Sequence, residues 1–84
     1  MTPLASDVQR RLEERRAAIE RSLPEAPTDT AWRELAETQA ALDRIEHGNY
    51  GRCESCDGAI GRQRLLALPA IRHCIACTPF AARG

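Results

Sequence analysis

Lysine is absent from this chain of 84 residues, and aromatic side chains are scarce, since Trp, Tyr and Phe occur once each. With so little bulk available, a core can be built only from Ala, Leu, Ile and Val, and it must be thin. A chain of this length forms one domain at most, and domains of this size often depend on a metal ion, a disulfide or a partner. We do not expect a packed catalytic pocket.

Long apolar runs are also absent, and the N-terminus has no basic segment followed by an apolar one. A membrane span needs ~20 predominantly apolar residues, and a signal peptide begins with that basic-then-apolar pattern. We therefore expect no membrane association, no signal peptide and a cytoplasmic location. Cysteine pairs in a reducing cytoplasm are typical of metal sites and not of disulfides.

An excess of charge is missing too, because twelve basic residues balance twelve acidic ones. Proteins that bind nucleic acid usually have a marked basic excess. Ten of the twelve acidic residues precede residue 52, so the first part of the chain is mildly acidic and the rest mildly basic. The sequence has no Ser/His/Asp set and no phosphate-binding glycine loop, and an enzyme is therefore not expected.

The segment of about residues 6–23 has the apolar periodicity of an amphipathic helix. Ser6 is its expected N-cap, because a Ser followed three residues later by Gln forms a capping box, and Pro24 ends the helix. The apolar stripe is interrupted at Arg15 and Arg16. Its members are Val8, Leu12, Ile19 and Leu23. We expect this stripe to face a partner helix.

A second amphipathic segment covers about residues 29–47, with Asp29 as a candidate N-cap and Gly48 at its C-terminus. Its stripe consists of Ala31, Leu35, Thr38, Leu42 and Ile45. The turn between the two segments is so short that the helices must lie antiparallel. Residues 1–48 are therefore predicted to form a coiled-coil-like helical hairpin with its tip at residues 24–29.

The helical periodicity stops after residue 48, where glycines become frequent. We expect turns there, and one short β-hairpin that pairs Ala59–Ile60 with Arg64–Leu68. A final short helix is expected at about Ile75–Ala82. Residues 49–84 thus form a small finger, and the predicted fold class is mainly α.

Four cysteines lie in this finger as two Cys-x-x-Cys pairs, separated by seventeen residues: Cys53, Cys56, Cys74 and Cys77. Each pair presents two sulfurs from one tight turn, and two pairs complete the tetrahedron of thiolates that a structural Zn²⁺ takes at ~2.3 Å. The pattern predicts one structural zinc ion, with a redox dithiol and an iron site as the alternatives. Four cysteines leave no open coordination position, so a catalytic metal is not expected.

Charged residues adjoin the predicted metal site. Four thiolates on Zn²⁺ carry a net negative charge. The nearby arginines either offset this charge or are simply exposed to solvent: Arg52, Arg62, Arg64 and Arg72. His73 is next to Cys74, but with four thiols available we interpret it as a neighbour and not a ligand. His47 is interpreted as interacting with the C-terminus of the second helix.

The finger resembles a known protein family through the residues Asn49-Tyr50-Gly51-Arg52-Cys53-Glu54-Ser55-Cys56, Ile60-Gly61, Arg64-Leu65, Pro69 and Cys74-Ile75-Ala76-Cys77. This pattern, dense across residues 45–77, is similar to the zinc finger of the DksA/TraR family, whose members also carry a helical hairpin before the finger. The resemblance implies a zinc-binding transcription regulator that inserts its hairpin into the secondary channel of bacterial RNA polymerase and does not recognise DNA sequence. It also implies ppGpp as a second partner, acting together with polymerase.

The hairpin tip carries part of the resemblance. The family's longer members need an Asp and an Ala two residues later for their effect on transcription, and Asp29 and Ala31 resemble that pair residue by residue. The family has another Asp three positions earlier, where this chain has Ala26. The arms are also several turns shorter than in full-length members. Trp32, beside the pair, either packs across the end of the hairpin or contacts a partner.

Two other functions compete with a polymerase regulator. A nucleic-acid-binding zinc ribbon is disfavoured by the zero net charge and by the near absence of aromatic residues for base stacking. A zinc-stabilised adaptor for another protein partner would have the same sequence features as a regulator. The partner that the chain binds distinguishes the three functions.

Overall fold

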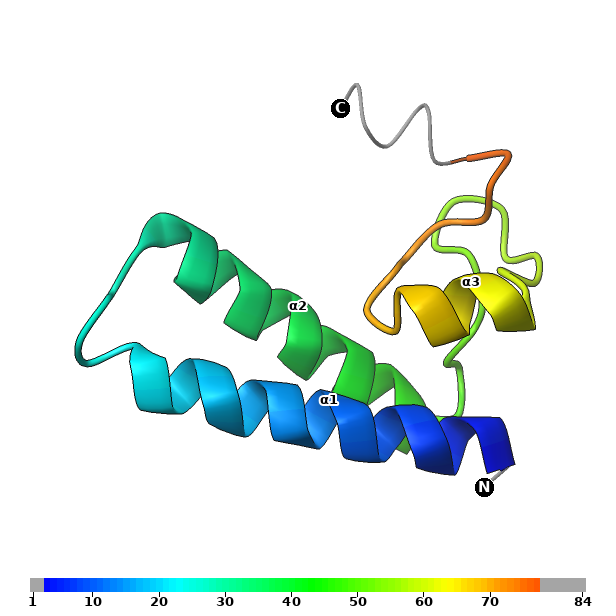
Figure 1. The fold of residues 1–84 in the computed structure, drawn as a ribbon. Helices are drawn as coiled ribbons and strands as arrows, with labels where there is room; N and C mark the ends of the chain where they lie inside the picture. The colour runs from blue at the N-terminus through cyan, green and yellow to red at the C-terminus, as the bar shows by residue number, and fades with distance from the viewer. Residues whose placement is uncertain (1–2, 78–84) are drawn as a thin grey trace.

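The computed structural model describes residues 3–77, which form a long helical hairpin with a small finger folded against its base (Figure 1). Within this range, the helices are α1 (Pro3–Ser22), α2 (Asp29–Glu46) and α3 (Arg62–Ala67). α1 and α2 run antiparallel, and α3 lies at the end of the hairpin opposite to the tip (Figure 1). The predicted mainly α fold, a helical hairpin followed by a small finger, is confirmed.

The start of α1 differs from the prediction. The helix begins at Pro3, so Ser6 lies inside its first turns and is not the N-cap. Proline suits this position because the first N–H groups of a helix have no intrahelical acceptor, and the proline ring already fixes a helical φ. At the other end, the N–H of Leu23 still bonds to the carbonyl of Ile19 at 3.0 Å. The helix ends just before Pro24, as predicted.

The N-cap of α2 is Thr28 and not Asp29. Thr28 has extended backbone angles, φ −89° and ψ 159°, and its Oγ1 accepts a hydrogen bond from the N–H of Ala31 at 3.0 Å. Asp29 is the first residue of the helix, where its carboxylate lies at the positive end of the helix dipole. The prediction gave Asp29 both the capping role and the acidic role, but in the structure Thr28 caps the helix and Asp29 supplies the charge.

The end of α2 follows the prediction. Gly48 has φ +76°, a conformation that favours glycine. The N–H of Gly48 bonds to the carbonyl of Ile45 at 3.2 Å, and the N–H of Asn49 bonds to that of Arg44 at 3.0 Å. This pair of bonds is a Schellman motif, which stops the helix and satisfies its last carbonyls. His47 interacts with the helix C-terminus as expected, since its Nδ1 donates to the carbonyl of Asp43 at 2.7 Å.

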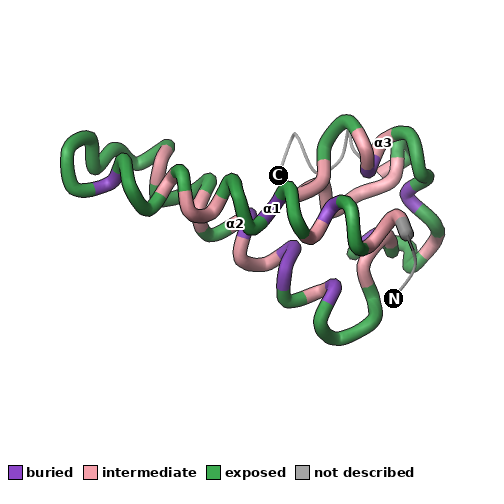
Figure 2. The backbone as a smooth tube through the Cα atoms, turned by 60° about the horizontal axis from the view of Figure 1, so that its bottom comes forward, coloured by how far each residue is buried: buried purple, intermediate pink, exposed green. Residues whose placement is uncertain are grey.

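The core of the hairpin lies at its base and not along its full length (Figure 2). The buried residues of the seam are Val8, Leu12, Ala41, Leu42 and Ile45. Thr38 continues the seam toward the tip and is also buried, with its hydroxyl donating to the carbonyl of Glu34 at 2.7 Å. Toward the tip most residues are exposed, and Leu23 is the buried exception (Figure 2).

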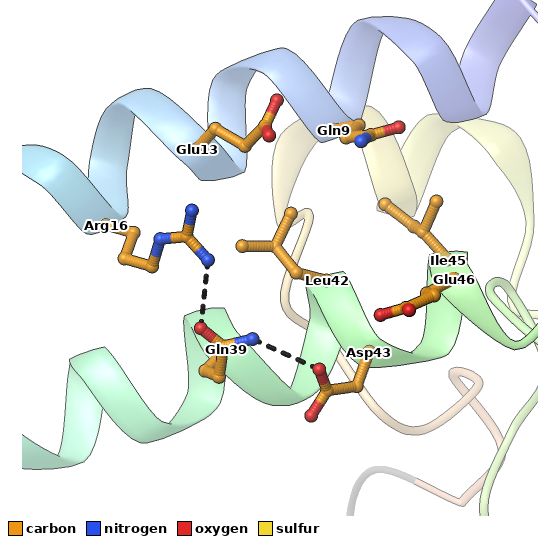
Figure 3. A pocket seen from close by; sticks show the side chains of 8 residues that line it. All are labelled: Gln9, Glu13, Arg16, Gln39, Leu42, Asp43, Ile45 and Glu46. Carbon is orange, nitrogen blue, oxygen red and sulfur yellow. Dashed lines mark hydrogen bonds between the residues drawn. The ribbon is translucent and has the colours of Figure 1, made fainter.

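A polar pair occupies the interruption that the sequence shows in the first apolar stripe. Arg16 is half-buried, and its Nη1 donates to Oε1 of Gln39 at 3.0 Å across the hairpin. Gln39 in turn donates to Oδ1 of Asp43 at 3.1 Å (Figure 3). These residues form one side of a shallow groove of about 420 Å³ between the two arms. Polar contacts therefore hold the two arms together at the position where the apolar stripe of α1 is interrupted.

The predicted β-hairpin of the finger is wrong. Residues 62–67 form α3, and the pairing of Arg52 with Ala59 is an isolated antiparallel bridge. The segment Arg-Gln-Arg-Leu-Leu-Ala consists of good helix formers, and it lacks the alternation that a strand requires. The predicted helix at Ile75–Ala82 lies largely outside the described residues, and the part that is described, residues 75–77, is a turn.

A second buried cluster joins the finger to the hairpin. It consists of Cys53, Ile60 and Leu65. Leu4 of α1 and Tyr50 pack against both this cluster and the hairpin core. The finger and the base of the hairpin thus share one apolar interior. Within the described residues, no helix combines the length and the apolar character that crossing a bilayer requires.

Candidate metal centre and hairpin tip

The structure brings the four predicted ligand residues together. The Sγ atoms of Cys53, Cys56, Cys74 and Cys77 all lie within 4.8 Å of one another. Zn–S bonds of ~2.3 Å in a tetrahedron place the sulfurs ~3.8 Å apart, and the Sγ atoms of Cys56 and Cys74 are 3.7 Å apart. All four cysteines are free, and a disulfide would require ~2.05 Å between two sulfurs. The cluster therefore fits one tetrahedral metal ion.

The first knuckle is a tight turn closed by backbone hydrogen bonds. The N–H of Cys53 bonds to the carbonyl of Gly58 at 2.8 Å, and the N–H of Asp57 bonds to that of Cys53 at 2.9 Å. The N–H of Gly58 points at Sγ of Cys56 at 3.4 Å. Such N–H···S contacts stabilise a thiolate. The first knuckle is thus shaped by hydrogen bonds between residues close together in the sequence.

The second knuckle is tied to the first through the backbone. The N–H of Cys77 bonds to the carbonyl of Cys74 at 3.1 Å, which closes the turn. The N–H of Glu54 bonds to the carbonyl of Arg72 at 2.9 Å and so fixes the two knuckles beside each other. Leu65 of α3 packs in the same cluster as Cys53, which is only 2% exposed. α3 therefore packs beside the metal site and helps to hold the two cysteine pairs next to each other.

The pKa values of three of the four thiols are shifted by their neighbours in the cluster. Backbone N–H groups, that of Cys74 foremost, hold the pKa of Cys53 at about 6 despite its burial. Hydrogen bonds with the thiols of Cys74, Cys53 and Cys56 raise the pKa of Cys77 to about 12. The N–H of Gly58 lowers the pKa of Cys56, but the thiols of Cys53 and Cys74 raise it more. The thiol of Cys53 therefore ionises more readily than those of Cys56 and Cys77, and a bound cation favours the thiolate form of its ligands.

The arginines near the metal site face acidic groups. Arg72 donates two hydrogen bonds to Glu37 of α2, at 2.6 and 3.1 Å, and one to Glu54 at 3.0 Å. Arg44 of α2 lies 3.9 Å from the same Glu54 carboxylate. We call Glu37, Arg44, Glu54 and Arg72 the Arg72 clamp. The hydrogen bond to Glu37 raises the pKa of Arg72, while burial lowers that of Arg44.

The clamp changes the interpretation of the nearby arginines. Arg52, for its part, pairs with Asp57 at 3.3 Å, and Arg64 donates to the carbonyl of His73 at 3.4 Å. Arg52 and Arg62 are exposed, in line with the solvent-facing alternative, whereas Arg72 joins the finger to the hairpin, a role that neither of the two interpretations included. The signal was present in the sequence, since Glu54 follows Cys53 directly and Arg72 precedes Cys74 by two residues.

Two further side chains, which the sequence analysis missed, fix α3 and the loop after it. The hydroxyl of Tyr50 donates to the carbonyl of Pro69 at 2.8 Å, and burial raises the pKa of this tyrosine. Arg11 of α1 donates to the carbonyl of Leu66 at 2.7 Å. Both contacts connect residues that are far apart in the chain, so no local sequence pattern predicts them.

The tip residues lie at the far end of the hairpin from the finger (Figure 1). Asp29 is exposed in the first turn of α2. Ala31 is half-buried, and its N–H is engaged by the Thr28 cap. Trp32 is one of the exposed large hydrophobic residues, with 54% of its surface accessible. The tip thus presents a carboxylate and an aromatic ring to solvent.

Comparison with known proteins gives two overlapping matches. Residues 48–78 match the family model of the prokaryotic dksA/traR C4-type zinc finger. The whole fold matches a solved structure of Chlamydia trachomatis with a TM-score of 0.84 and 25% sequence identity, covering 100% of this chain and 94% of that one. That protein is described as the RNA polymerase binding protein and transcriptional regulator Dks.

A protein of Aquifex aeolicus described as uncharacterized is 46% identical over 43 residues. The aligned part is 51% of this chain but only 30% of the Aquifex protein, so the chain corresponds to less than a third of that relative. The C4-type finger and the clustered thiols fit one structural zinc ion, and the predicted cofactor is confirmed. The finger sequence and the complete fold agree, since residues 48–78 match the DksA/TraR C4-type zinc finger and the chain as a whole has a fold like that of Dks.

Proposed function

We propose that this chain binds bacterial RNA polymerase and regulates transcription by placing its hairpin tip in the secondary channel. The observation that carries the proposal is the match to Chlamydia Dks, which extends over the whole chain, hairpin included. That protein is described as binding RNA polymerase and regulating transcription. Because the match spans nearly all of that chain too, arms of this length are compatible with a polymerase-binding regulator. The DksA/TraR family is a family of regulators and not of enzymes.

In this proposal the two parts of the chain have different tasks. The finger, residues 49–84, holds zinc through Cys53, Cys56, Cys74 and Cys77 and docks on the polymerase surface. The hairpin, residues 1–48, reaches inward, and Asp29 and Ala31 act at its tip. The Arg72 clamp supports this arrangement, because it fixes the finger against the arm that carries the tip. A cytoplasmic location and the absence of DNA sequence recognition belong to the same proposal.

The proposed role of ppGpp depends on polymerase. Within the described residues, three arginines around the finger already face carboxylates of the same chain: Arg44, Arg52 and Arg72. A tetraphosphate would have to displace those carboxylates to use these guanidinium groups. We therefore propose that ppGpp acts on a surface that this chain forms together with polymerase.

The test is transcription in vitro with the cognate polymerase, with and without ppGpp, after co-purification from native lysate. We expect polymerase subunits to co-purify and wild-type protein to alter initiation. Asp29→Asn should abolish the effect on transcription while binding persists, because most of the contact area lies elsewhere. Glu25→Gln is the matched control, since it neutralises an exposed carboxylate of the same tip that lies outside the motif.

The other results identify the competing functions. Co-purification of RNA or DNA without polymerase would favour a nucleic-acid-binding zinc ribbon, and another protein would favour an adaptor. Polymerase binding with a fully active Asp29→Asn variant would keep the partner but reject the tip mechanism.

A further inference from the structure

Trp32 is the most exposed aromatic group of the described residues and lies where the hairpin would meet a partner. It is the chain's single tryptophan, and 54% of its surface is accessible. Most residues of its half of the hairpin are exposed (Figure 2). Tryptophan is enriched at the centres of protein interfaces, so an indole exposed at the tip is a candidate contact for a partner.

Asp29 lies on the same face of α2 as Trp32. The two residues are three apart in the helix, which places their side chains next to each other. Aromatic side chains in helices lean back over the preceding turn, and for Trp32 that is the turn containing Asp29. Among the described residues, the Asp29 carboxylate makes no ion pair or hydrogen bond, because Thr28 supplies the cap. It is therefore available to a partner.

We propose that Trp32 and Asp29 together form a receptor for one cationic side chain, a lysine or an arginine, of the protein partner. The indole face attracts a cation through its quadrupole, and the adjacent carboxylate attracts the same cation and accepts its hydrogen bonds. The two groups are presented by a helix whose start is fixed by the Thr28 cap. The receptor is thus ordered before the partner arrives, which reduces the entropic cost of binding.

A cation fits this tip better than an apolar or an anionic group. An apolar partner surface that covered the indole would also remove water from Asp29, leaving a desolvated charge without compensation. An anionic partner such as a nucleic acid would be repelled by the same carboxylate. A lysine or arginine places its aliphatic stem and its charge on both halves of the receptor.

The inference rests on the proposed function, because the partner tested is bacterial RNA polymerase. Trp32 is replaced biosynthetically by 5-hydroxytryptophan, which is excited separately from the tryptophans of polymerase. Fluorescence anisotropy reports binding, and acrylamide quenching reports how far the indole is covered. We expect quenching to fall several-fold on binding.

Competition against the labelled protein then compares affinities of variants, with circular dichroism as the check on folding. Trp32→Leu keeps an apolar group but removes the ring, and should weaken binding ~10-fold, while Trp32→Phe should be intermediate. Asp29→Asn should weaken binding severalfold at most. The same substitution should have a smaller effect on affinity in the Trp32→Leu background. Arg33→Gln is the opposite control: it removes a neighbouring positive charge and should leave affinity unchanged or improved.

The outcomes are separable. Binding with unchanged quenching, or equal affinity of Trp32→Leu and wild type, would overturn the receptor while the proposed function stands. Weaker binding by Arg33→Gln than by Asp29→Asn would show that the partner group is anionic and would also overturn it. If wild-type protein does not bind polymerase at all, the receptor and the proposed function fall together.

Discussion

Two adjacent residues at the tip divide between them the tasks of starting a helix and presenting a charge. Thr28 accepts the hydrogen bond from Ala31, and Asp29 is left with its carboxylate in solvent. This matters for function because a residue that caps a helix cannot be changed without loosening the tip. In this chain the charge of Asp29 can be altered while the cap stays in place.

The cap predicts different stabilities for two alanine variants. Thr28→Ala removes the acceptor for an N–H of the first turn and should lower the free energy of unfolding by about 1 kcal/mol. Asp29→Ala removes a favourable dipole interaction but gains helix propensity, so its cost should be ~0.5 kcal/mol or less. Urea denaturation of the zinc-loaded proteins measures both. If Asp29→Ala lowered the free energy of unfolding more than Thr28→Ala, Asp29 and not Thr28 would be the cap.

The finger and the hairpin are coupled by elements that meet at the base. α3 and the loop after it pack against the hairpin core through Leu66 and Ala70, and Arg11 of α1 donates to the carbonyl of Leu66. On the opposite arm, the Arg72 clamp connects α2 to both knuckles. The contacts are charge-assisted, and their side chains are partly exposed, so each is of modest strength. Together they set the direction in which the tip points relative to the metal site.

The Arg72 clamp gives a prediction at this scale. Arg72→Gln removes the hydrogen bonds to Glu37 and Glu54 and leaves the two carboxylates near each other. We expect a loss of about 1 kcal/mol in the free energy of unfolding, already reduced for solvent screening, and a smaller loss at high salt.

Arg52→Gln is the control for this experiment. Its pair with Asp57 is 61% and 77% exposed, so its loss should cost ~0.3 kcal/mol or less. Urea denaturation at low and high ionic strength compares the two variants. Equal, salt-independent effects would mean that the clamp contributes no more than an ordinary surface pair.

At the scale of the whole molecule, we expect zinc to stabilise more than the finger. Leu4 and Tyr50 contact both the hairpin core and the cluster around Cys53, so the two interiors are continuous. The chain buries few large side chains, and a helical hairpin of this length has little stability of its own. Structural zinc contributes on the order of 10 kcal/mol in small fingers. Loss of the metal should therefore spread into the base of the hairpin.

Chelation tests this coupling. We expect amide exchange to become fast throughout residues 49–77 and also at the base, around Val8, Leu12, Ala41 and Ile45, while the molecule keeps part of its helical circular dichroism. Adding zinc back should restore the protection. Unchanged exchange in the finger after complete metal removal would show that zinc does not hold it. Loss confined to the finger would show that the shared interior is too weak to transmit it.

The sequence by itself determined those features whose energy lies within a few residues. The period of the apolar stripes defined α1 and α2, Pro24 and Gly48 marked their ends, and the spacing of the four cysteines predicted two knuckles and a zinc ion. Each of these signals acts through neighbouring residues, such as the Schellman bonds at Gly48 or the closed turn from Cys53 to Asp57. The family resemblance could be read from the same local pattern.

Tertiary structure decided what depends on contacts between distant residues. Glu37 and Arg72 are 35 positions apart, and Arg11 and Leu66 are 55 apart, so no local pattern pairs them. The segment 62–67 consists of good helix formers, but its position is set by tertiary contacts, because Leu65 belongs to the finger cluster and Leu66 packs against the hairpin core. Thr and Asp are both good N-cap residues, and the extended backbone angles of Thr28 make it the cap in place of Asp29. Only the folded chain shows where the finger returns to the hairpin, because that geometry is set by the shared interior and not by any one segment.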